Sequence, residues 1–371
     1  MSYKKEFILA DGIYLLSHSV GRPLLNCHDV LQQTFLDPWQ QSNREPWPDW
    51  LAVISEFQTA LAHLFHAQAE DFCPQANLSS ALTKILGSLA QLQQANTTVL
   101  LSEDDFPSMA FAFQHALHQQ ANIRFMPKQT DLTQFDNWLP YLTDDLDAVF
   151  ICHAYSNTGQ VAPINEIVAK TKAMGIISII DCAQSAGVVP LDISHTDADF
   201  VIGSSVKWLC GGPGAAFLWV NPKREAQCQP KDVGWFSHQD PFEFNSHHFS
   251  YHSSALKFWG GTPSILPYAI AANSIGYFAK LSAKKIQSHN QALLLPLINA
   301  FTQYCVSPTE LLLASGTCIL NFANKQENIL TALRKNNISV DVRKYGIRIS
   351  PHIYNDETQI DQLIGIIKQN L

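Results

Sequence analysis

Short apolar runs that alternate with helical stretches between about residues 98 and 220 constrain the fold of this chain more than any other feature. The runs read TVLLS at 98–102, AVFICH at 148–153, ISIID at 177–181 and DFVIGS at 199–204. This alternation is typical of an α/β fold, a mostly parallel sheet covered by helices on both faces. A further run, GAAFLWV at 214–220, is predicted to close the sheet as an additional strand. Because such sheets bind ligands at the carboxyl ends of their strands, the residues that end these runs are the first candidates for a functional site.

Two of these residues are an acid and a lysine. Asp181 ends the ISIID run, and Lys207 follows the next run, just before the glycine-rich segment 211–214. We expect Lys207 to lie on a turn, where apolar neighbours lower its pKa and make a neutral amine available for a Schiff base. Pyridoxal phosphate needs such a lysine, together with an acid that keeps the pyridinium nitrogen protonated. Taken singly, Lys207 can also be a solvated turn residue and Asp181 a helix cap.

The segments around these two residues extend the argument. DCAQSAGVVPLD at 181–192 and SSVKWLCGGPG at 204–214 resemble the core of the class V aminotransferase family, whose members are fold type I pyridoxal phosphate enzymes. The resemblance covers roughly residues 10 to 370. It implies a mostly parallel, seven-stranded sheet in a large domain and a smaller α+β domain at the C-terminus. The implied cofactor is pyridoxal 5'-phosphate, and Lys207 is the implied catalytic lysine.

The same resemblance assigns residues around the cofactor. CPQANLSSALTKIL at 73–86 resembles the phosphate-binding turn and its helix, which implies phosphate contacts at Asn77 and Leu78. SEDDFPS at 102–108 resembles the segment that lays an aromatic ring, here Phe106, over the cofactor. The other implied positions are Ser156 and Gln184 near the phenolic oxygen, Asp181 at the ring nitrogen, Ser204 at the phosphate, and Arg348 at the substrate carboxylate.

Two further segments, VGWFSHQDPFEF at 233–244 and GGTPSIL at 260–266, resemble kynureninases within that family. In those enzymes a tryptophan and a threonine reach the cofactor phosphate, partly from the neighbouring subunit. The resemblance implies these roles for Trp235 and Thr262, and a homodimer with active sites at its interface. YLLSHSVGRPL at 14–24 resembles the kynureninase entry segment near the active site. The subgroup implies an amino-acid substrate and hydrolytic cleavage of its Cβ–Cγ bond.

Departures from the kynureninase pattern leave other reactions open. Val206 stands where kynureninases carry a tyrosine before the lysine, and Met109 stands where an acid is expected. A class V aminotransferase is therefore the first alternative. A cysteine desulfurase or lyase is another, although a desulfurase needs a nucleophilic thiolate shortly before the arginine, and the segment 329–348 contains no cysteine. A pyridoxal phosphate-binding module without turnover also stays open.

Composition narrows the possible partners. The net charge of −8 argues against general nucleic-acid binding, which favours a basic face. The 14 histidines form no pair with a convincing metal-ligand spacing, so no metal is expected. The eight cysteines are scattered without a CxxC pair, as expected of reduced thiols. With no secretory signal and no long apolar run, the sequence predicts a cytoplasmic protein without membrane partners.

Hydrophobic periodicity predicts the remaining organisation. It indicates helices at 50–69, 78–94 and 108–119, and a polar, tryptophan-bearing loop at 38–48. After about residue 265 it indicates a long helix, strands near 318–323, 338–342 and 346–350, and a last helix from 356. We expect residues 1–30 to pack with a small domain near the active site, residues 31–255 to form the large cofactor-binding domain, and residues 256–371 to form the small domain.

Overall fold

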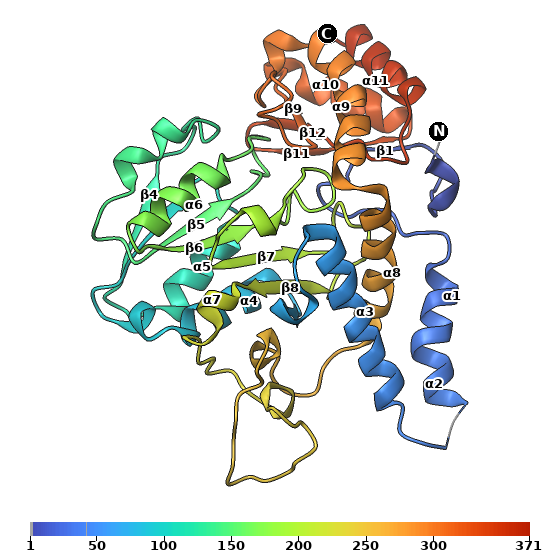
Figure 1. The fold of residues 1–371 in the computed structure, drawn as a ribbon. Helices are drawn as coiled ribbons and strands as arrows, with labels where there is room; N and C mark the ends of the chain where they lie inside the picture. Colours follow the sequence, from blue (N-terminus) through green and yellow to red (C-terminus); the bar gives the residue numbers. More distant parts are fainter. Residues whose placement is uncertain (1–2, 42) are drawn as a thin grey trace.

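The computed structural model describes residues 3–41 and 43–371, which form a large α/β part and a smaller α+β part that holds the C-terminus (Figure 1). The strands are β1 (Ile13–Tyr14), β2 (Phe72–Gln75), β3 (Thr98–Ser102), β4 (Asn122–Met126), β5 (Ala148–Cys152), β6 (Ile177–Asp181), β7 (Phe200–Ser204), β8 (Ala216–Val220), β9 (Cys318–Leu320), β10 (Ile338–Ser339), β11 (Asp341–Arg343) and β12 (Gly346–Ile349). The α-helices are α1 (Cys27–Leu31), α2 (Asp37–Gln40), α3 (Trp47–Phe65), α4 (Leu78–Ser88), α5 (Pro107–Ala116), α6 (Ile164–Ala173), α7 (Pro222–Glu225), α8 (Leu266–Leu281), α9 (Ala283–Ala300), α10 (Gln326–Lys335) and α11 (Glu357–Gln369).

A mostly parallel sheet lies at the centre of the large part, which confirms the predicted α/β fold. Among the described residues it has seven strands in the order β2-β8-β7-β6-β5-β3-β4. The strands from β4 to β7 are parallel, whereas β8 is antiparallel to both of its neighbours. The run at 214–220 adds a strand, β8, to the sheet as predicted, but it does not close the sheet, because β2 lies outside it. The β2 segment contains Pro74, which resembles a turn in sequence, and an edge strand is where a sheet accepts proline.

The strands that end at the candidate site are fully covered. Every residue of β3, β5 and β6 is buried, as expected of parallel strands with helices on both faces. Each fully buried Ile, Leu or Val side chain contributes about 1.5–3 kcal/mol relative to exposure. The base of the site is therefore rigid.

The predicted helices exist, but they begin and end at other residues than the hydrophobic periodicity predicts. α3 begins at Trp47, inside the segment 38–48 predicted as a loop, and it ends before His66, which adopts a left-handed φ of 55°. α2 also lies partly in that segment. α4 ends at Ser88 rather than at residue 94, because Leu89 is extended and a 3-10 turn follows it. Apolar spacing continues across these breaks, so periodicity alone does not reveal them.

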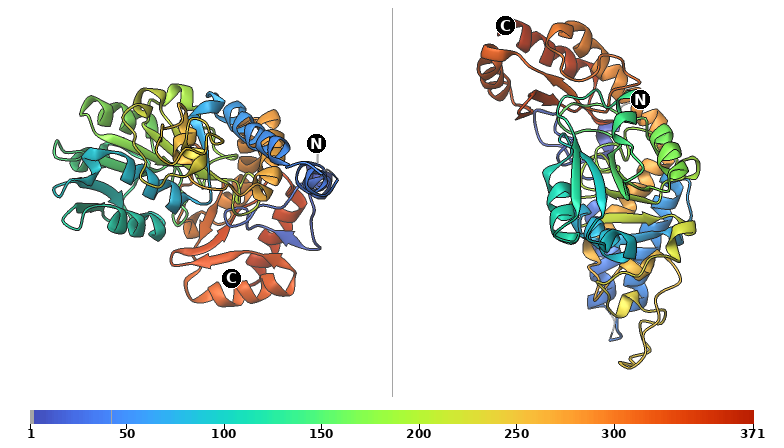
Figure 2. Two further views of the ribbon diagram at one scale, coloured as in Figure 1. Left: turned by 90° about the horizontal axis from the view of Figure 1, so that it is seen from below. Right: turned by 90° about the vertical axis from the view of Figure 1, so that its left-hand side faces the viewer.

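The long helix predicted after residue 265 is two helices, α8 and α9, separated at Ser282, whose φ is 67°. Beyond them, β11, β12 and β9 form an antiparallel sheet, and α9, α10 and α11 pack with it around a second cluster of buried apolar residues. Figure 2 shows this C-terminal part at one end of the molecule.

The N-terminal segment connects the two parts. β1 pairs in parallel with β10, and Leu16 bridges to Ser350 beyond β12. A few residues later, the Gly21 N–H donates to the carbonyl oxygen of Val206 at 2.9 Å. The segment thus runs from the C-terminal sheet to the turn that carries Lys207.

The length and hydropathy of the helices bear on membrane insertion. Within residues 3–41 and 43–371, no helix has both the length and the apolar character that crossing a bilayer requires.

Replacing Gly21 with alanine tests how closely this segment packs on the lysine turn. An alanine Cβ would lie 2.1 Å from the Lys207 carbonyl oxygen and 2.6 Å from Cys210 Sγ, so the segment must move. We expect Gly21→Ala to lower the free energy of unfolding by about 1–3 kcal/mol, measured by urea denaturation. The control is Gly87→Ala in α4, where the described residues leave open space around the new Cβ. That change should stabilise by about 0.5–1 kcal/mol, and equal urea midpoints for the two variants would contradict the packing argument.

Candidate active site

Asp181 is the last residue of β6, and it lies buried at the carboxyl edge of the sheet. Its Oδ1 accepts a hydrogen bond from the Ala183 N–H at 2.8 Å. Its Oδ2 is 3.9 Å from Sγ of Cys152, the residue that pairs with Asp181 on β5. Burial raises the pKa of Asp181, while the Ala183 N–H and the positive charge of Lys207 act in the opposite direction. One carboxylate oxygen is thus fixed by the backbone, and the other is left for a cationic partner.

Lys207 lies in the turn between β7 and β8, where it is partly accessible. Ser205 shapes this turn, because its hydroxyl donates to the carbonyl oxygens of Ala215 at 2.8 Å and Gly212 at 3.1 Å. Burial lowers the pKa of Lys207, whereas the negative charge of Asp181 raises it, and the nearby Arg348 charge lowers it again. Desolvation prevails over the attraction, so a larger share of this amine is neutral at pH 7 than of an exposed lysine.

Arg348 reaches the same place from β12. Its side chain is buried, forms an ion pair with Asp341 through Nη2, and donates from Nη1 to the Ser156 carbonyl oxygen at 3.2 Å. Nε is buried and has no hydrogen-bond partner in the described part of the chain. Desolvation lowers the pKa of Arg348, opposed by Asp341. The guanidinium therefore retains an unused donor, although β11 supplies its counter-ion.

His18, in the N-terminal segment, lies near the same charges. Together with Asp181, Lys207 and Arg348 it forms a group that we call the inner ring of the site. Its ring lies 2.6 Å from the Ser350 hydroxyl through Nδ1 and 3.5 Å from Asp341 Oδ2 through Nε2. Burial lowers the pKa of His18, and a hydrogen bond to Asp341 opposes this. Gln184 donates from Nε2 to the His18 carbonyl oxygen at 3.1 Å. Three distant segments of the sequence thus meet around Lys207.

The other predicted site residues differ in whether they contact the inner ring of the site. Ser156 contacts Arg348, though through its carbonyl oxygen, and the Ser204 hydroxyl accepts from the Val206 N–H at 3.4 Å beside Lys207. No hydrogen bond, ion pair or ring contact within the described residues joins the remaining positions to Lys207, Asp181 or Arg348. These positions are Asn77, Leu78, Phe106, Trp235 and Thr262.

Each of the remaining positions has a local environment of its own. Asn77 caps α4 by accepting from the Ser80 N–H at 2.9 Å, so Leu78 begins a helix whose first N–H groups have no intrahelical partners. Phe106 precedes α5 and is 56% exposed. Trp235 packs edge-on against Trp47, with ring centroids 5.6 Å apart.

Sequence reasoning missed several polar groups of the site. Asp341 lies opposite Arg348 in the β11–β12 hairpin, a register that the short Lys344–Tyr345 turn could have revealed. Asp105, directly before Phe106, accepts from the Ser102 N–H at 2.7 Å, and burial raises its pKa to about 7. Two adjacent acids before an aromatic residue were a visible signal for it.

Two more groups had no clear sequence signal. The Tyr155 hydroxyl is buried and has no partner among the described residues. His18 lies in a segment that the resemblance places near the active site, but the residue itself was not singled out. The fold also brings together His238, Glu243 and His248, whereas the sequence analysis expected no metal ligands.

The residues present fit pyridoxal phosphate. A buried acid faces a lysine of lowered pKa, as the ring nitrogen and the aldehyde of that cofactor require. The N-terminus of α4, with its N–H groups, suits a phosphate. The unpartnered Nε of Arg348 suits a substrate carboxylate, as judged from the described residues.

Asp105 makes the stability of the cofactor-free protein depend on pH. Its pKa is about 7 in the folded state and near the ordinary aspartate value when unfolded, so the unfolded chain binds fewer protons between these values. Stability contributed by this group therefore falls as pH rises from about 4 to 7. We expect the stability of Asp105→Asn relative to wild type to be greater at pH 8 than at pH 5, by on the order of 2 kcal/mol. Urea unfolding of the cofactor-free protein at both pH values measures this, and an equal difference at both would refute it.

Comparison with known proteins agrees with this geometry. The family model described as aminotransferase class-V matches residues 50–363. Similar curated proteins include a kynureninase from Deinococcus radiodurans, 28% identical over 301 residues that cover 78% of this chain and 71% of that protein. A kynureninase from Shouchella clausii is 23% identical, with 99% of this chain and 90% of that protein covered. An uncharacterised aminotransferase, YcbU of Bacillus subtilis, is 23% identical, with 86% and 85% covered.

Solved structures show the same fold at lower identity. A cysteine desulfurase from Thermococcus onnurineus has a TM-score of 0.86 at 16% identity, with 97% of this chain and 94% of that chain covered. A cystine C-S lyase has a TM-score of 0.85 at 19% identity, with 96% and 97% covered. The family match covers most of the chain, and the neighbours share its whole architecture. The chain belongs to the aminotransferase class-V family and is a pyridoxal 5'-phosphate-dependent enzyme of fold type I.

Proposed function

We propose that this enzyme is a kynureninase-type hydrolase, which cleaves the Cβ–Cγ bond of an amino acid with water as the second reactant. One observation carries the proposal: Lys207 lies within electrostatic reach of both Asp181 and Arg348. An acid for the ring nitrogen of the cofactor, an amine for its aldehyde and a guanidinium for a carboxylate together suit an α-amino acid as substrate. The similarity to kynureninases along 99% of the chain supports the hydrolytic branch.

Each residue of the inner ring has a role in this proposal. Pyridoxal phosphate, when bound, supplies an electron sink for the α-carbon of the substrate. Asp181 holds the proton on the ring nitrogen, and its buried position keeps water from competing. Lys207, with its lowered pKa, moves a proton at the substrate α-carbon.

Arg348 is proposed to bind the substrate carboxylate. Its Nε has no partner among the described residues, and Nη1 is held only by a carbonyl oxygen at 3.2 Å. The Nε–H lies on the same edge of the guanidinium as Nη2, so a carboxylate that accepts from both through parallel hydrogen bonds shares Nη2 with Asp341. A carboxylate fixed there orients the substrate, so that the bond to be cleaved stands perpendicular to the cofactor ring.

The outer positions are proposed to hold the cofactor. The backbone at Asn77 and Leu78 and the Ser204 hydroxyl suit the phosphate, because helix N-termini attract anions. Ser156 and Gln184 are proposed near the phenolic oxygen. Phe106, being 56% exposed, is free to cover one face of the ring.

The cysteines argue against a desulfurase. Burial raises the pKa of Cys152 and Cys182 well above the ordinary thiol value, and a hydrogen bond to Cys305 together with burial does the same for Cys318, so none of the three is a ready thiolate. Cys305, whose pKa is lowered by a hydrogen bond from Cys318, sits in a bridge to β9 and not on a loop before Arg348. Transamination remains the second candidate, because Val206 offers no phenol beside the lysine.

Product analysis with kynurenine tests the hydrolase proposal. We expect the purified protein with pyridoxal phosphate to release anthranilate and alanine from kynurenine. Lys207→Ala should lower this rate by at least about 10³-fold, because it removes the proton-transfer group. Lys223→Ala, which alters an exposed lysine, is the matched control and should keep the wild-type rate.

Other outcomes of that experiment are informative. A keto acid with a pyridoxamine-type spectrum would replace the hydrolase with an aminotransferase. Sulfide from cysteine would replace it with a desulfurase or lyase. No spectral change with any amino acid would leave a binding module without turnover.

A homodimer with shared active sites is also proposed, with Trp235 and Thr262 serving the partner's cofactor phosphate. Among the described residues of this monomer, no hydrogen bond, ion pair or ring contact links Trp235 or Thr262 to Lys207, which accords with a role in the other subunit. Mixing Lys207→Ala with Trp235→Ala subunits tests this, because one site of each mixed dimer is then intact. We expect each variant alone to be impaired and the mixture to recover roughly a quarter of wild-type activity. A mixture no more active than the variants themselves would place Trp235 in its own subunit's site.

A further inference from the structure

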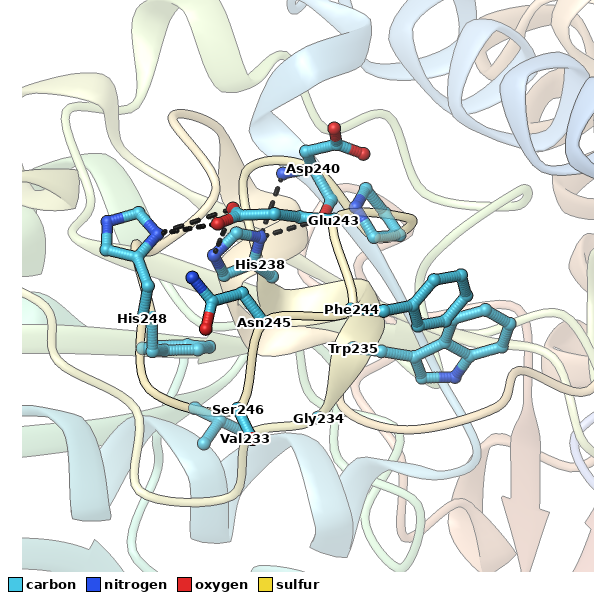
Figure 3. A pocket seen from close by; sticks show the side chains of 12 residues that line it. Val233, Gly234, Trp235, His238, Asp240, Glu243, Phe244, Asn245, Ser246 and His248 are labelled. Carbon is cyan, nitrogen blue, oxygen red and sulfur yellow. Dashed lines mark hydrogen bonds and ion pairs between the residues drawn. The ribbon is translucent and has the colours of Figure 1, made fainter.

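A loop at residues 233–251, between α7 and the 3-10 turn Ala255–Phe258, encloses a pocket of about 350 Å³ away from the lysine site. Figure 3 shows His238, Glu243 and His248 directed toward one another on one side of this pocket. One ligand atom from each of the three side chains lies within 4.8 Å of the others. The lysine chemistry uses none of these groups, so they need a separate explanation.

The distances within this group suit a shared cation. Glu243 Oε2 is 3.5 Å from His238 Nε2 and 3.3 Å from His248 Nδ1, and Oε1 is 3.1 Å from the same His248 nitrogen. In a tetrahedral zinc site with bonds near 2.0–2.1 Å, neighbouring ligand atoms are about 3.3 Å apart. The distances from Glu243 to each histidine are therefore close to those of a zinc site, and the two imidazole nitrogens lie within 4.8 Å of each other.

The second nitrogen of each imidazole is already held. His238 Nδ1 lies 2.8 Å from the Asp240 carbonyl oxygen and 3.0 Å from the Asp240 backbone nitrogen, and His248 Nε2 lies 3.3 Å from the Ser250 hydroxyl. The carbonyl is the shorter of the two contacts of Nδ1, and in the tautomer that donates to it, Nε2 keeps its lone pair toward Glu243. Metal-binding histidines are usually oriented in this way by an outer partner.

His238 Nε2 provides the strongest sign that something is missing. The residue is only 7% exposed, and this nitrogen has no hydrogen-bond partner within the described residues. Buried polar atoms in native proteins nearly always have a partner, so an unpartnered nitrogen aimed at a carboxylate and a second imidazole indicates a ligand.

We propose that His238, Glu243 and His248 bind one divalent transition-metal ion of the zinc class. Two imidazoles and a carboxylate favour zinc over calcium or magnesium, which prefer oxygen ligands alone. Three protein ligands leave a fourth position for water. An ion bound there cross-links positions 238, 243 and 248 of the loop next to Trp235. This assignment does not depend on the proposed reaction.

Zinc binding by the holoenzyme tests the site. After treatment with a chelator and dialysis, we expect the wild type to bind one zinc ion per chain in a calorimetric titration, confirmed by elemental analysis. Glu243→Gln and His248→Ala should weaken binding on the order of 100-fold or more, because each removes a ligand. His247→Ala is the matched control, since it alters the exposed histidine next to His248, and it should bind as the wild type does.

Two results would overturn the assignment. One is a wild type that binds no stoichiometric zinc. The other is unchanged binding in Glu243→Gln and His248→Ala, which would place the ion elsewhere, for example on cysteines. Both side chains are substantially exposed, at 34% and 56%, so these variants should fold, and a thermal melt without zinc checks that they do.

Discussion

The electrostatic balance between the buried Asp181 and the partly accessible Lys207 is the interaction on which this site depends. Burial raises the pKa of the acid and lowers that of the amine, and their mutual attraction opposes both shifts. Removing one partner of such a pair leaves an uncompensated charge, which costs several kcal/mol in a buried setting. The sheet provides this setting because β5 and β6 are buried over their whole length and end together at Cys152 and Asp181. The buried strands thus provide the desolvated setting that lowers the pKa of the lysine amine.

The segments that complete the site lie far from the lysine in sequence. Arg348 arrives on β12, and His18 arrives on the N-terminal segment that β1 ties to β10. The Gly21 backbone then contacts the lysine turn directly. Because Asp341 contacts both His18 and Arg348, it holds the positive side of the site together while leaving Nε of the arginine without a partner in the described chain. In the proposed function, a substrate carboxylate therefore meets a guanidinium whose position is already fixed.

The sequence was a good guide where a local pattern dictates position. A buried apolar run must end somewhere, and Asp181 and Lys207 follow two neighbouring runs, so their meeting at one sheet edge could be predicted. β2 was missed because four residues with a proline carry no strand signal until β8 offers an edge. His18 and the group of His238, Glu243 and His248 were missed for a different reason. Their partners lie on loops or across long distances, and spacing in sequence does not determine the approach of loop side chains.

The reaction is less constrained than the cofactor because it depends on groups around the substrate's β and γ carbons. Val206 can transfer no proton, so a hydrolase of this design needs another donor. Tyr155 is the phenol that the fold supplies: its hydroxyl is buried, it has no partner among the described residues, and the charges of Asp105 and Asp181 act on it. Burial raises the pKa of Tyr155 well above the ordinary phenol value, so its hydroxyl stays protonated at neutral pH. The strand-end loop after β5 thus holds a buried phenol on which the charges of Asp105 and Asp181 act, whereas the position before the lysine carries a valine.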